Sequence, residues 1–395
     1  MSLEIEILGI TFPNPFVLAA GPPTASGDLV IKAFEAGWGG VVLKTIGMQP
    51  TRDPCPRIHI IRSGRDRVGM FDIELISEKT VDQWEDEIDR IRDAFPDRPL
   101  IASIMGGADP DEWQEVVRRL EPHGIDAFEM NTSCPNFAAE RGSKLGQDPE
   151  SLALAVGWVR EATDRPVIVK LTPNVTDIVA LARAALEAGA DAFTATNSLS
   201  GLAGIDLDTL VPLPNVGGVG IRGGYGGPGL KPVALRCTAD VAQALGVPIF
   251  GCGGVARWQD AVEYLAVGAS AVQVCTAVMW DGAQIIRRLT RGLEEYLQKK
   301  GYRAVKDLVG KALPNLGQFP DLDISIRLAA AVDEDRCTGC GICARACDSG
   351  GYQAIEMAGV ARVDPFKCDG CGLCVQLCPE GAIRLQPAQA AGHAQ

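Results

Sequence analysis

The 395-residue chain is acidic, with a formal net charge of −13, and 47% of its residues are hydrophobic. This composition supports a large globular core, and the negative charge disfavours nucleic acid and anionic membrane as partners, since both bind basic surfaces. No apolar run approaches about 18 residues, and the first residues lack the charged and apolar regions of a secretory signal, so we expect a cytoplasmic protein.

The chain begins with a short alternating segment and continues with a regular rhythm of apolar runs and helical patterns. Residues 3–14 alternate around Gly9, which predicts a small hairpin. Strands are predicted at residues 16–20, 40–44, 100–105, 127–131, 167–171, 192–196, 249–251 and 271–275. Helices are predicted at residues 29–36, 81–94, 110–121, 150–161, 178–188, 233–245, 258–267 and 282–299.

This rhythm predicts an α/β fold, a (β/α)8 TIM barrel over residues 1–301. Apolar strands that alternate with amphipathic helices indicate a parallel sheet covered by helices. Eight repeats over about 280 residues match such a barrel in number and length. A doubly wound open sheet is the alternative, but no G-x-G-x-x-G motif follows the first strand, which weakens it.

In a barrel of this kind the active site lies at the carboxyl ends of the strands. Lysines, asparagines, small residues and cysteines occur at these predicted ends. Cys134 follows the fourth strand, between Asn131 and Asn136, and is a candidate reacting group, although a half-buried structural cysteine is the commoner case. Three long connections, residues 45–80, 135–149 and 199–232, are expected to be functional or disordered, and the second follows Cys134 as a mobile lid.

The last part of the chain carries eight of its thirteen cysteines in a spacing that is typical of bacterial ferredoxins. The run C-x2-C-x2-C-x3-C occurs twice, and in two-cluster ferredoxins the fourth cysteine of each run binds the other cluster. One [4Fe–4S] cluster is therefore assigned to Cys337, Cys340, Cys343 and Cys378, and the second to Cys368, Cys371, Cys374 and Cys347. Two zinc sites are the alternative, but zinc sites usually have a longer loop between their C-x2-C pairs.

This reading divides the C-terminal part of the chain into three segments. Residues 302–332 are expected to be a linker, residues 333–386 a small α+β ferredoxin-like domain, and residues 387–395 a disordered tail. Asp348 follows Cys347 where proline is usual after the fourth cysteine, which can alter the local turn without removing a ligand.

A barrel joined to one-electron clusters needs a cofactor that converts between one- and two-electron chemistry, and flavin does so. The loops after the seventh and eighth strands, with Gly253, Gly254 and Thr276, are suited to a phosphate. Lys44 or Lys170 beside the flavin ring would stabilise the negative charge of its reduced form. A flavin is therefore the cofactor expected in the barrel.

Short segments throughout the chain carry a resemblance to a known family. They are residues 34–39, 44–45, 73–79, 101–105, 131–135, 146–150, 170–177, 194–197 and 273–275 in the barrel, and 347–355 in the tail. In these segments the chain resembles the dihydroorotate dehydrogenase superfamily, and most closely the dihydropyrimidine dehydrogenases, over roughly residues 5–385. The tail segment includes Asp348, so this departure is itself shared with the family.

The resemblance implies that FMN accepts electrons from the clusters and passes a hydride to one carbon of a ring C=C. Cys134, on a mobile loop, would protonate the neighbouring carbon as general acid, converting uracil or thymine to the 5,6-dihydro form, or the reverse. It implies FMN contacts at Ala20, Lys44, Thr45, Lys170, Asn197, Gly227, Gly253, Gly254 and Thr276. It implies substrate contacts at Asp72, Asn131, Asn197 and Ser198.

Two of these positions depart from the family pattern. Ser198 replaces a threonine, and Asp72 replaces an asparagine that faces the pyrimidine. Asparagine both donates and accepts hydrogen bonds, whereas an ionised aspartate only accepts, which is repulsive against a ring carbonyl unless Asp72 is protonated or turned away. We therefore expect a substrate that presents a donor toward Asp72, or one that is neither uracil nor thymine.

The chain shows no second nucleotide-binding domain, so the electrons are expected to come from a partner. That partner would be a separate subunit that binds FAD and NAD(P)H, or a ferredoxin or flavodoxin; a homo-oligomer is also compatible with the sequence. A dihydroorotate-type dehydrogenase, with Cys134 as base, and a reductase of a non-pyrimidine enone or heterocycle are the alternative enzymes. A pure electron-transfer module is an alternative of a different class.

Overall fold

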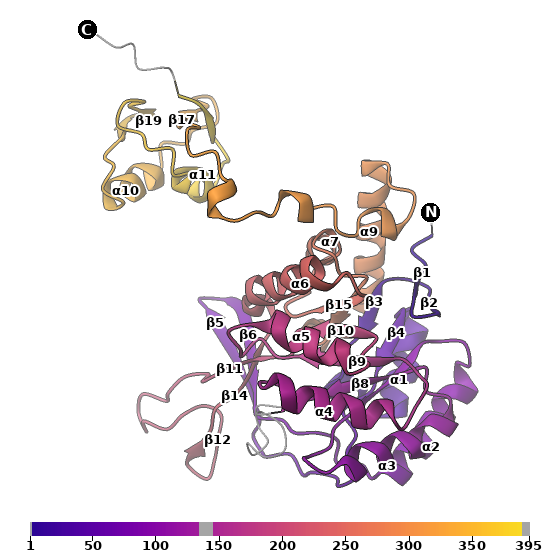
Figure 1. Cartoon of the computed structure of the whole chain (residues 1–395). Coiled ribbons are helices and arrows are strands. Elements are labelled where there is room, and N and C mark those ends of the chain that lie inside the picture. The colour runs from indigo at the N-terminus through magenta and orange to yellow at the C-terminus, as the bar shows by residue number, and fades with distance from the viewer. Residues whose placement is uncertain (1, 134–144, 389–395) are drawn as a thin grey trace. The chain divides into compact units, whose positions relative to one another are not determined.

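The computed structural model describes residues 2–133 and 145–388 (Figure 1). The chain divides into two compact units, residues 1–316 and 317–395. Within the described residues, no helix is long and apolar enough to cross a membrane.

The first unit is a closed barrel of eight parallel strands in the order β10-β15-β16-β3-β4-β7-β8-β9. Its strands are β3 (Phe16–Leu18), β4 (Gly40–Val42), β7 (Leu100–Ile104), β8 (Ala127–Asn131), β9 (Val167–Leu171), β10 (Ala192–Ala195), β15 (Ile249–Cys252) and β16 (Ala271–Val274). Its helices are α1 (Gly27–Ala36), α2 (Val81–Ala94), α3 (Pro110–Leu120), α4 (Pro149–Arg160), α5 (Ile178–Glu187), α6 (Lys231–Leu245), α7 (Trp258–Ala266), α8 (Thr276–Asp281) and α9 (Ile286–Lys300). The predicted (β/α)8 barrel is confirmed.

The helices begin and end where the sequence provides caps. Helix α1 starts after Ser26, whose side chain accepts a hydrogen bond from the Leu29 N–H, and α2 starts with a capping box made by Thr80 and Gln83. Gly37 ends α1 in the left-handed conformation, with φ of 112°, where a side chain would be strained. These local signals set the lengths of the connections that lead into each barrel strand.

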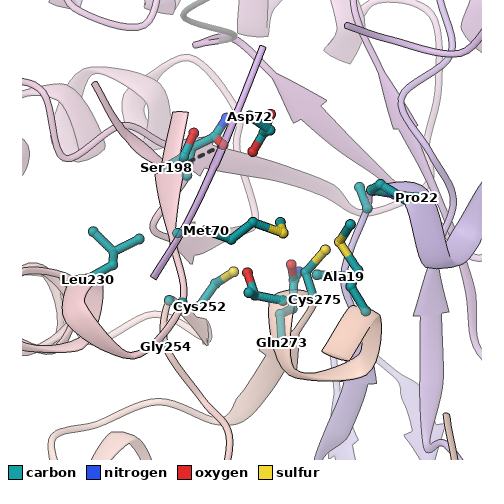
Figure 2. A pocket seen from close by; sticks show the side chains of 18 of the residues that line it. Ala19, Pro22, Met70, Asp72, Ser198, Leu230, Cys252, Gly254, Gln273 and Cys275 are labelled. Carbon is teal, nitrogen blue, oxygen red and sulfur yellow. Dashed lines mark hydrogen bonds between the residues drawn. The ribbon is translucent and has the colours of Figure 1, made fainter. Parts of the chain in front are cut away.

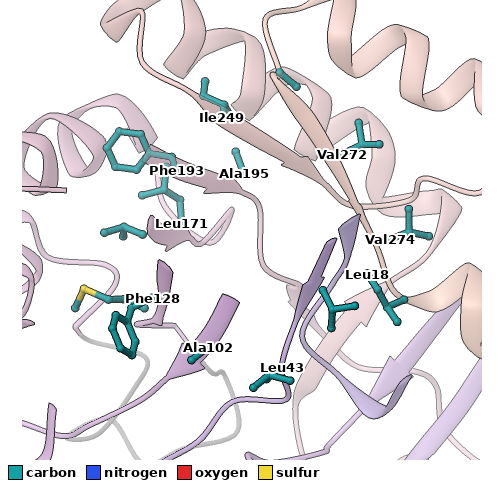
Figure 3. Close-up of a cluster of buried hydrophobic side chains, with 14 of the residues drawn as sticks. Leu18, Leu43, Ala102, Phe128, Leu171, Phe193, Ala195, Ile249, Val272 and Val274 are labelled. Carbon is teal, nitrogen blue, oxygen red and sulfur yellow. The ribbon is translucent and has the colours of Figure 1, made fainter. Parts of the chain in front are cut away.

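Successive side chains along each barrel strand point alternately outward to the helices and inward to the barrel interior. Outward-facing side chains pack against the helices, and Figure 3 labels Leu18, Phe128, Leu171 and Val274 among them. A second apolar cluster combines inward residues of the eight strands with the N-terminal hairpin: Ile7, Phe12, Val17, Val42, Ile101, Ala127, Ile168, Ala192, Phe250 and Ala271. The hairpin, β1 (Ile5–Ile7) with β2 (Ile10–Phe12), is the one the sequence predicts, and it contributes to this inner cluster.

Two of the long connections build a sheet together. Strands β5 (Ile58–Ser63) and β6 (Asp66–Asp72) lie in the connection after β4, and β11 (Leu199–Gly201) and β14 (Gly223–Gly226) lie in the connection after β10. They form a four-stranded sheet in the order β11-β14-β6-β5. Beyond it, β12 (Asn215–Val216) and β13 (Val219–Gly220) pair as a small ribbon. These connections are therefore neither disordered nor independent loops.

The second unit contains two antiparallel pairs and two short helices. Strand β17 (Leu328–Val332) pairs with β20 (Ile383–Pro387), and β18 (Ile355–Ala358) pairs with β19 (Val360–Val363). The helices are α10 (Ile342–Ser349) and α11 (Leu373–Leu377). This small α+β architecture agrees with the predicted ferredoxin-like fold.

The boundary between the units differs from the expected linker, residues 302–332. Val305 and Leu308 are buried in the barrel core, so the chain is still part of the first unit after Gly301. Residues 328–332 are already a strand of the second unit, because they pair with β20. Strand β20 also continues through Pro387, and the end of the predicted disordered tail, residues 389–395, lies outside the described residues.

Candidate functional site

A cavity lies at the carboxyl ends of the barrel strands, and it extends over about 1170 Å³ including its open mouth. Figure 2 shows Asp72 and Ser198 on one side of it and Cys252, Gln273 and Cys275 on another. The residues expected to contact cofactor or substrate that the structure describes all line it: Ala20, Lys44, Thr45, Asp72, Asn131, Lys170, Asn197, Ser198, Gly227, Gly253, Gly254 and Thr276. Cys134, the expected general acid, lies outside the described residues.

The floor of the cavity is a buried ion pair in which both carboxylate oxygens accept hydrogen bonds. Lys170 Nζ lies 3.2 Å from Glu129 Oε1, and Glu129 is fully buried. The other carboxylate oxygen, Glu129 Oε2, accepts hydrogen bonds from Thr194 Oγ1 at 2.7 Å and from Gln273 Nε2 at 2.6 Å. Burial is the largest influence and opposes the charged form of Lys170, but the charge and hydrogen bond of Glu129, together with the nearby Cys252 and Cys275, act the other way, and the pKa of Lys170 is raised. The floor therefore holds a permanent ammonium group.

Sequence reasoning missed three members of this floor: Glu129, Thr194 and Gln273. Each lies two positions further along its strand than an inward apolar residue of the inner cluster, such as Ala127 before Glu129. The signal was a single polar side chain inside an otherwise apolar strand, which is uncommon unless the group is paired.

One wall of the cavity holds a second lysine in a richer set of charges. Lys44 Nζ lies 3.0 Å from Glu74 Oε1 and 3.9 Å from Asp53 Oδ2. Arg57 Nε approaches the same two carboxylates, at 3.4 and 3.6 Å. Lys44 and the two carboxylates are nearly buried, and Arg57 covers them from the solvent side with 39% of its side chain exposed. The role of Asp53 and Arg57 was not visible in the sequence, because they lie in a connection with no regular pattern.

Asp72 ends β6 and adds a third carboxyl group to this wall. Its Oδ1 accepts a hydrogen bond from the Glu74 N–H at 3.3 Å. Burial, together with the nearby negative charge of Glu74, raises the pKa of Asp72 to about 7, although Lys44 and the backbone hydrogen bond act in the opposite direction. Near neutral pH the Asp72 carboxyl is therefore divided between its protonated and ionised forms.

The asparagines expected to contact substrate are joined to each other. Asn197 Nδ2 donates to Asn131 Oδ1 at 3.1 Å, and Asn131 Nδ2 donates to Thr45 Oγ1 at 3.1 Å. Asn197 Oδ1 accepts from the Ser198 N–H at 2.8 Å, which orients the neighbouring residue. This chain of hydrogen bonds holds donors and acceptors in place along one side of the cavity, an arrangement suited to the N–H and C=O groups of a ring.

Glycine loops and Thr276 come together at another part of the cavity. A Cβ added at Gly254, which has φ of 74°, would lie 2.9 Å from the Gly227 carbonyl oxygen. A Cβ added at Gly226 would lie 3.3 Å from Thr276 Oγ1. The three segments can approach so closely only because side chains are absent, and this leaves backbone groups and one hydroxyl to bind a phosphate.

Two thiols complete the lining. Burial chiefly raises the pKa of Cys252, and the same effect raises the pKa of Cys275 to about 12. Both are therefore neutral thiols, and they present polarizable, weakly polar surface beside the Lys170 ammonium. This lining is compatible with a flat aromatic ring system, and the glycine loops are compatible with a phosphate. Lys170 can stabilise negative charge on the ring. The residues present therefore fit FMN.

The eight cysteines of the second unit surround two separate cavities. One is lined by Cys347, Cys368, Cys371 and Cys374, and the other by Cys337, Cys340, Cys343 and Cys378. These are the two quartets that the spacing assigns, with the fourth cysteine of each run placed at the other cavity. This crosswise arrangement of two four-cysteine sets is typical of two-cluster ferredoxins.

Backbone N–H groups point at three of the cysteine sulfurs. Ala330 N–H donates to Cys368 Sγ at 3.4 Å, and Ala354 N–H donates to Cys347 Sγ at 3.3 Å. Ala382 N–H donates to Cys378 Sγ at 3.3 Å. Hydrogen bonds of this type stabilise the negative charge of cluster thiolates and help to set the reduction potential of a cluster.

Comparisons with known proteins identify a family for each of the two units. Residues 2–297 match the family described as "Dihydroorotate dehydrogenase", and residues 330–385 match the "4Fe-4S dicluster domain". The "NAD-dependent dihydropyrimidine dehydrogenase subunit PreA" of Escherichia coli is 36% identical over 361 residues, which cover 90% of this chain and 88% of that protein.

Two further relatives represent other branches. The "Dihydroorotate dehydrogenase B (NAD(+)), catalytic subunit" of Pyrococcus furiosus is 41% identical over 79% of this chain and 99% of its own length. The "Dihydropyrimidine dehydrogenase (NADP(+)), chloroplastic" of Arabidopsis thaliana is 34% identical over 81% of this chain and 79% of its own length. The family binds FMN and the dicluster domain binds two [4Fe–4S] clusters, and both fit the sites described above. The chain therefore belongs to the dihydroorotate dehydrogenase family of oxidoreductases that act on CH–CH groups, and it carries an additional 4Fe-4S dicluster domain.

Proposed function

We propose that this enzyme interconverts a pyrimidine-like ring and its 5,6-dihydro form, in the manner of uracil or thymine reduction or its reverse. The observation that carries the proposal is a cavity at the strand ends that combines a flavin-compatible floor with two asparagines suited to a ring, Asn131 and Asn197. When bound there, FMN supplies hydride transfer to and from a ring carbon and exchanges single electrons with the clusters.

The residues of the chain divide this work between them. Lys170 places a permanent positive charge at the floor, where it stabilises negative charge on a bound ring system. Asn131 and Asn197 orient the substrate ring through their amide groups. We assign Cys134 as the group that gives a proton to the ring carbon next to the one that receives hydride, or takes it in reverse; a thiol with a pKa near 8.5 suits this task at neutral pH.

The ferredoxin-like unit implies a redox partner for this chain. The eight cluster ligands, Cys337, Cys340, Cys343, Cys347, Cys368, Cys371, Cys374 and Cys378, would relay electrons between the barrel flavin and an external donor or acceptor. We propose as this partner a separate subunit that binds FAD and NAD(P)H, or a ferredoxin. The reducing cytoplasm, where such thiolate ligands persist, is the compartment we propose.

A dihydroorotate-type oxidation is the second candidate. The observation that favours it is the 41% identity with an archaeal catalytic subunit whose name assigns it that reaction. In this case electrons leave through the clusters and Cys134 acts as the base.

Anaerobic purification with bound cofactors separates these candidates. Uracil, thymine, dihydrouracil and dihydroorotate are mixed in turn with the oxidised or the chemically reduced enzyme, and flavin absorbance is followed. Bleaching by dihydrouracil, or reoxidation by uracil or thymine, supports the first proposal, whereas bleaching by dihydroorotate alone supports the second.

The role of Cys134 is tested in the same assay. The Cys134→Ala variant is expected to keep its FMN and to lose at least about a hundredfold in ring turnover, because a positioned general acid contributes about 10²–10⁴-fold. If the variant turns over as fast as the wild type, Cys134 is not the proton donor. If no ring changes the flavin spectrum of either protein, the barrel is an electron carrier and the proposal is wrong.

A further inference from the structure

The carboxyl group of Asp72 lines the proposed substrate cavity, and it can donate a hydrogen bond only when it is protonated. Its Oδ1 accepts from the Glu74 N–H, while no described residue donates to its Oδ2. The neighbours opposite Asp72 in the added sheet are Ile58 on β5 and Gly224 on β14, neither of which has a polar side chain. Asp72 lines the cavity, so a ring bound beside it would have this carboxyl group as a neighbour.

The absence of a side chain at Gly224 leaves space beside Asp72 Oδ2. A Cβ added at Gly224 would lie 3.7 Å from Asp72 Oδ2 and 2.5 Å from Ser198 Oγ, so the glycine brings the hydroxyl and the carboxyl to the same place. Ser198 and Asp72 both line the cavity (Figure 2). The carboxyl group is thus set at an edge where a substrate ring would present either an oxygen or an N–H.

The charges around Asp72 are unevenly distributed. Glu74 and Asp53 disfavour its ionised form, Lys44 favours it, and Arg57 pairs with the first two. The Cys275 thiol faces the same cavity and is neutral, and Ser198 and Gly224 bring no charge. His59 follows Ile58 on β5, so strand alternation directs it to the opposite face of the sheet. Asp72 is therefore the carboxyl of this wall that lacks a cationic partner within ion-pairing distance among the described residues.

We propose that Asp72 selects the substrate edge through its own protonation: as a neutral carboxyl it donates to a ring carbonyl oxygen, and as a carboxylate it accepts from a ring or amino N–H. This inference rests on the proposed function, because it assumes a pyrimidine-like ring in this cavity. A fixed amide at this position would offer both a donor and an acceptor at every pH, whereas Asp72 offers a donor only when protonated.

The consequence is that binding of a carbonyl-bearing ring is coupled to proton uptake. Burial raises the pKa of Asp72 to about 7, so the free enzyme holds this proton at pH 6 and has mostly lost it at pH 8. A ring that binds only the neutral carboxyl then binds about tenfold more weakly at pH 8 than at pH 6, and takes up about 0.9 proton at pH 8 and about 0.1 at pH 6.

The experiment is isothermal titration calorimetry of uracil into the anaerobic, cofactor-loaded full chain, in buffers of different ionisation enthalpy. The wild type is expected to show the tenfold change in dissociation constant and the proton uptake. Asp72→Asn, which keeps the size of the side chain, is expected to show less than a twofold change and no uptake. Asp208→Asn, an exposed aspartate in the connection after β11, is the matched control and is expected to behave as the wild type.

FMN content, measured by absorbance, establishes that each variant is folded at the barrel. Uracil affinity that is independent of pH in the wild type, proton uptake that survives in Asp72→Asn, or absence of uracil binding at pH 6 each overturns the inference. Failure of the proposed function has a different signature: none of the tested rings alters the flavin spectrum of wild type or variant at any pH.

Discussion

The floor and the wall of the cavity each pair a lysine with buried carboxylates, but they differ in how completely the charges are satisfied. On the floor, the Glu129 carboxylate receives hydrogen bonds from Lys170, Thr194 and Gln273, and it is fully buried. On the wall, Lys44 faces Glu74 and Asp53, and Asp72 stands next to them with no ion pair to any residue that the structure describes.

This difference teaches how one cavity can contain both a constant and an adjustable charge. A buried pair with all hydrogen bonds satisfied keeps its ionisation state, because losing either partner leaves an unpaired buried charge. A carboxyl in excess over its cations changes its protonation near neutral pH instead. The floor is suited to a cofactor that is always present, and the wall to a ligand that comes and goes.

The largest expected effect comes from breaking the floor. Lys170→Met removes one partner of the buried pair and should lower the free energy of unfolding by about 3–5 kcal/mol, with loss of bound flavin, because Glu129 is left uncompensated. Anaerobic urea unfolding and flavin release measure this. The double variant Lys170→Met/Glu129→Met should recover much of the stability but not the flavin; a loss below 1 kcal/mol in the single variant would show that the floor is not preorganised.

The contribution of Asp72 to stability should fall as pH rises, whereas that of an ion-paired carboxylate with a lowered pKa rises. The pKa of Asp72 is raised from 3.8 to about 7, so its contribution to stability is present below pH 4 and is lost as pH rises through 7. The free energy of unfolding of Asp72→Asn, relative to that of the wild type, should therefore rise by up to about 4 kcal/mol between pH 4 and pH 8. Urea midpoints at both values check this, and a constant difference between the two proteins would contradict a shifted carboxyl.

A smaller effect is expected from a single hydrogen bond of the floor. Thr194→Val removes the hydroxyl that donates to Glu129 Oε2 and should cost about 1–3 kcal/mol, because the oxygen loses one of its donors in a buried place. Thr194→Ser keeps the hydroxyl and serves as the control. Equal stability of the two variants would mean that Gln273 alone satisfies this oxygen.

The smallest effect is expected at the solvent side of the wall. Arg57→Ala removes a cation whose side chain is 39% exposed, and Lys44 remains to pair with Glu74. Exposed ion pairs contribute about 0–1 kcal/mol, so the unfolding free energy should hardly change, and Arg57→Lys should match the wild type. If Arg57→Ala lowered the free energy of unfolding as much as Lys170→Met does, the floor and the wall would not differ in how strongly their charges are coupled to stability.

The sequence predicts the repeating parts of this molecule well because they depend on local signals. Helix α2 begins and ends at the predicted residues, Val81 and Ala94, since a capping box and an amphipathic pattern define it. The barrel strands are apolar runs between such helices, and closure into a barrel follows from their number. The strand ends then bring the lysines and asparagines to one cavity, although they are far apart in the chain.

Features that depend on contacts between distant segments could not be predicted in the same way. The pairing of Lys170 with Glu129 requires the register of two strands, and the added sheet requires two connections separated by more than a hundred residues to pair. Strand β11 has three residues and β14 consists mostly of glycine, so neither carries a β pattern. The departure at Asp72 was visible in the sequence, but its shifted pKa arises from burial beside Glu74, which only the fold provides.

Asp72 is carried by β6, a strand of the added sheet, whereas Lys170 and Glu129 belong to strands of the barrel. The hairpin of β5 and β6 is inserted between β4 and α2, and neither of its strands belongs to the closed barrel. New substrate preferences can thus be acquired, by natural divergence or by grafting a hairpin from a relative, while the redox machinery is inherited unchanged.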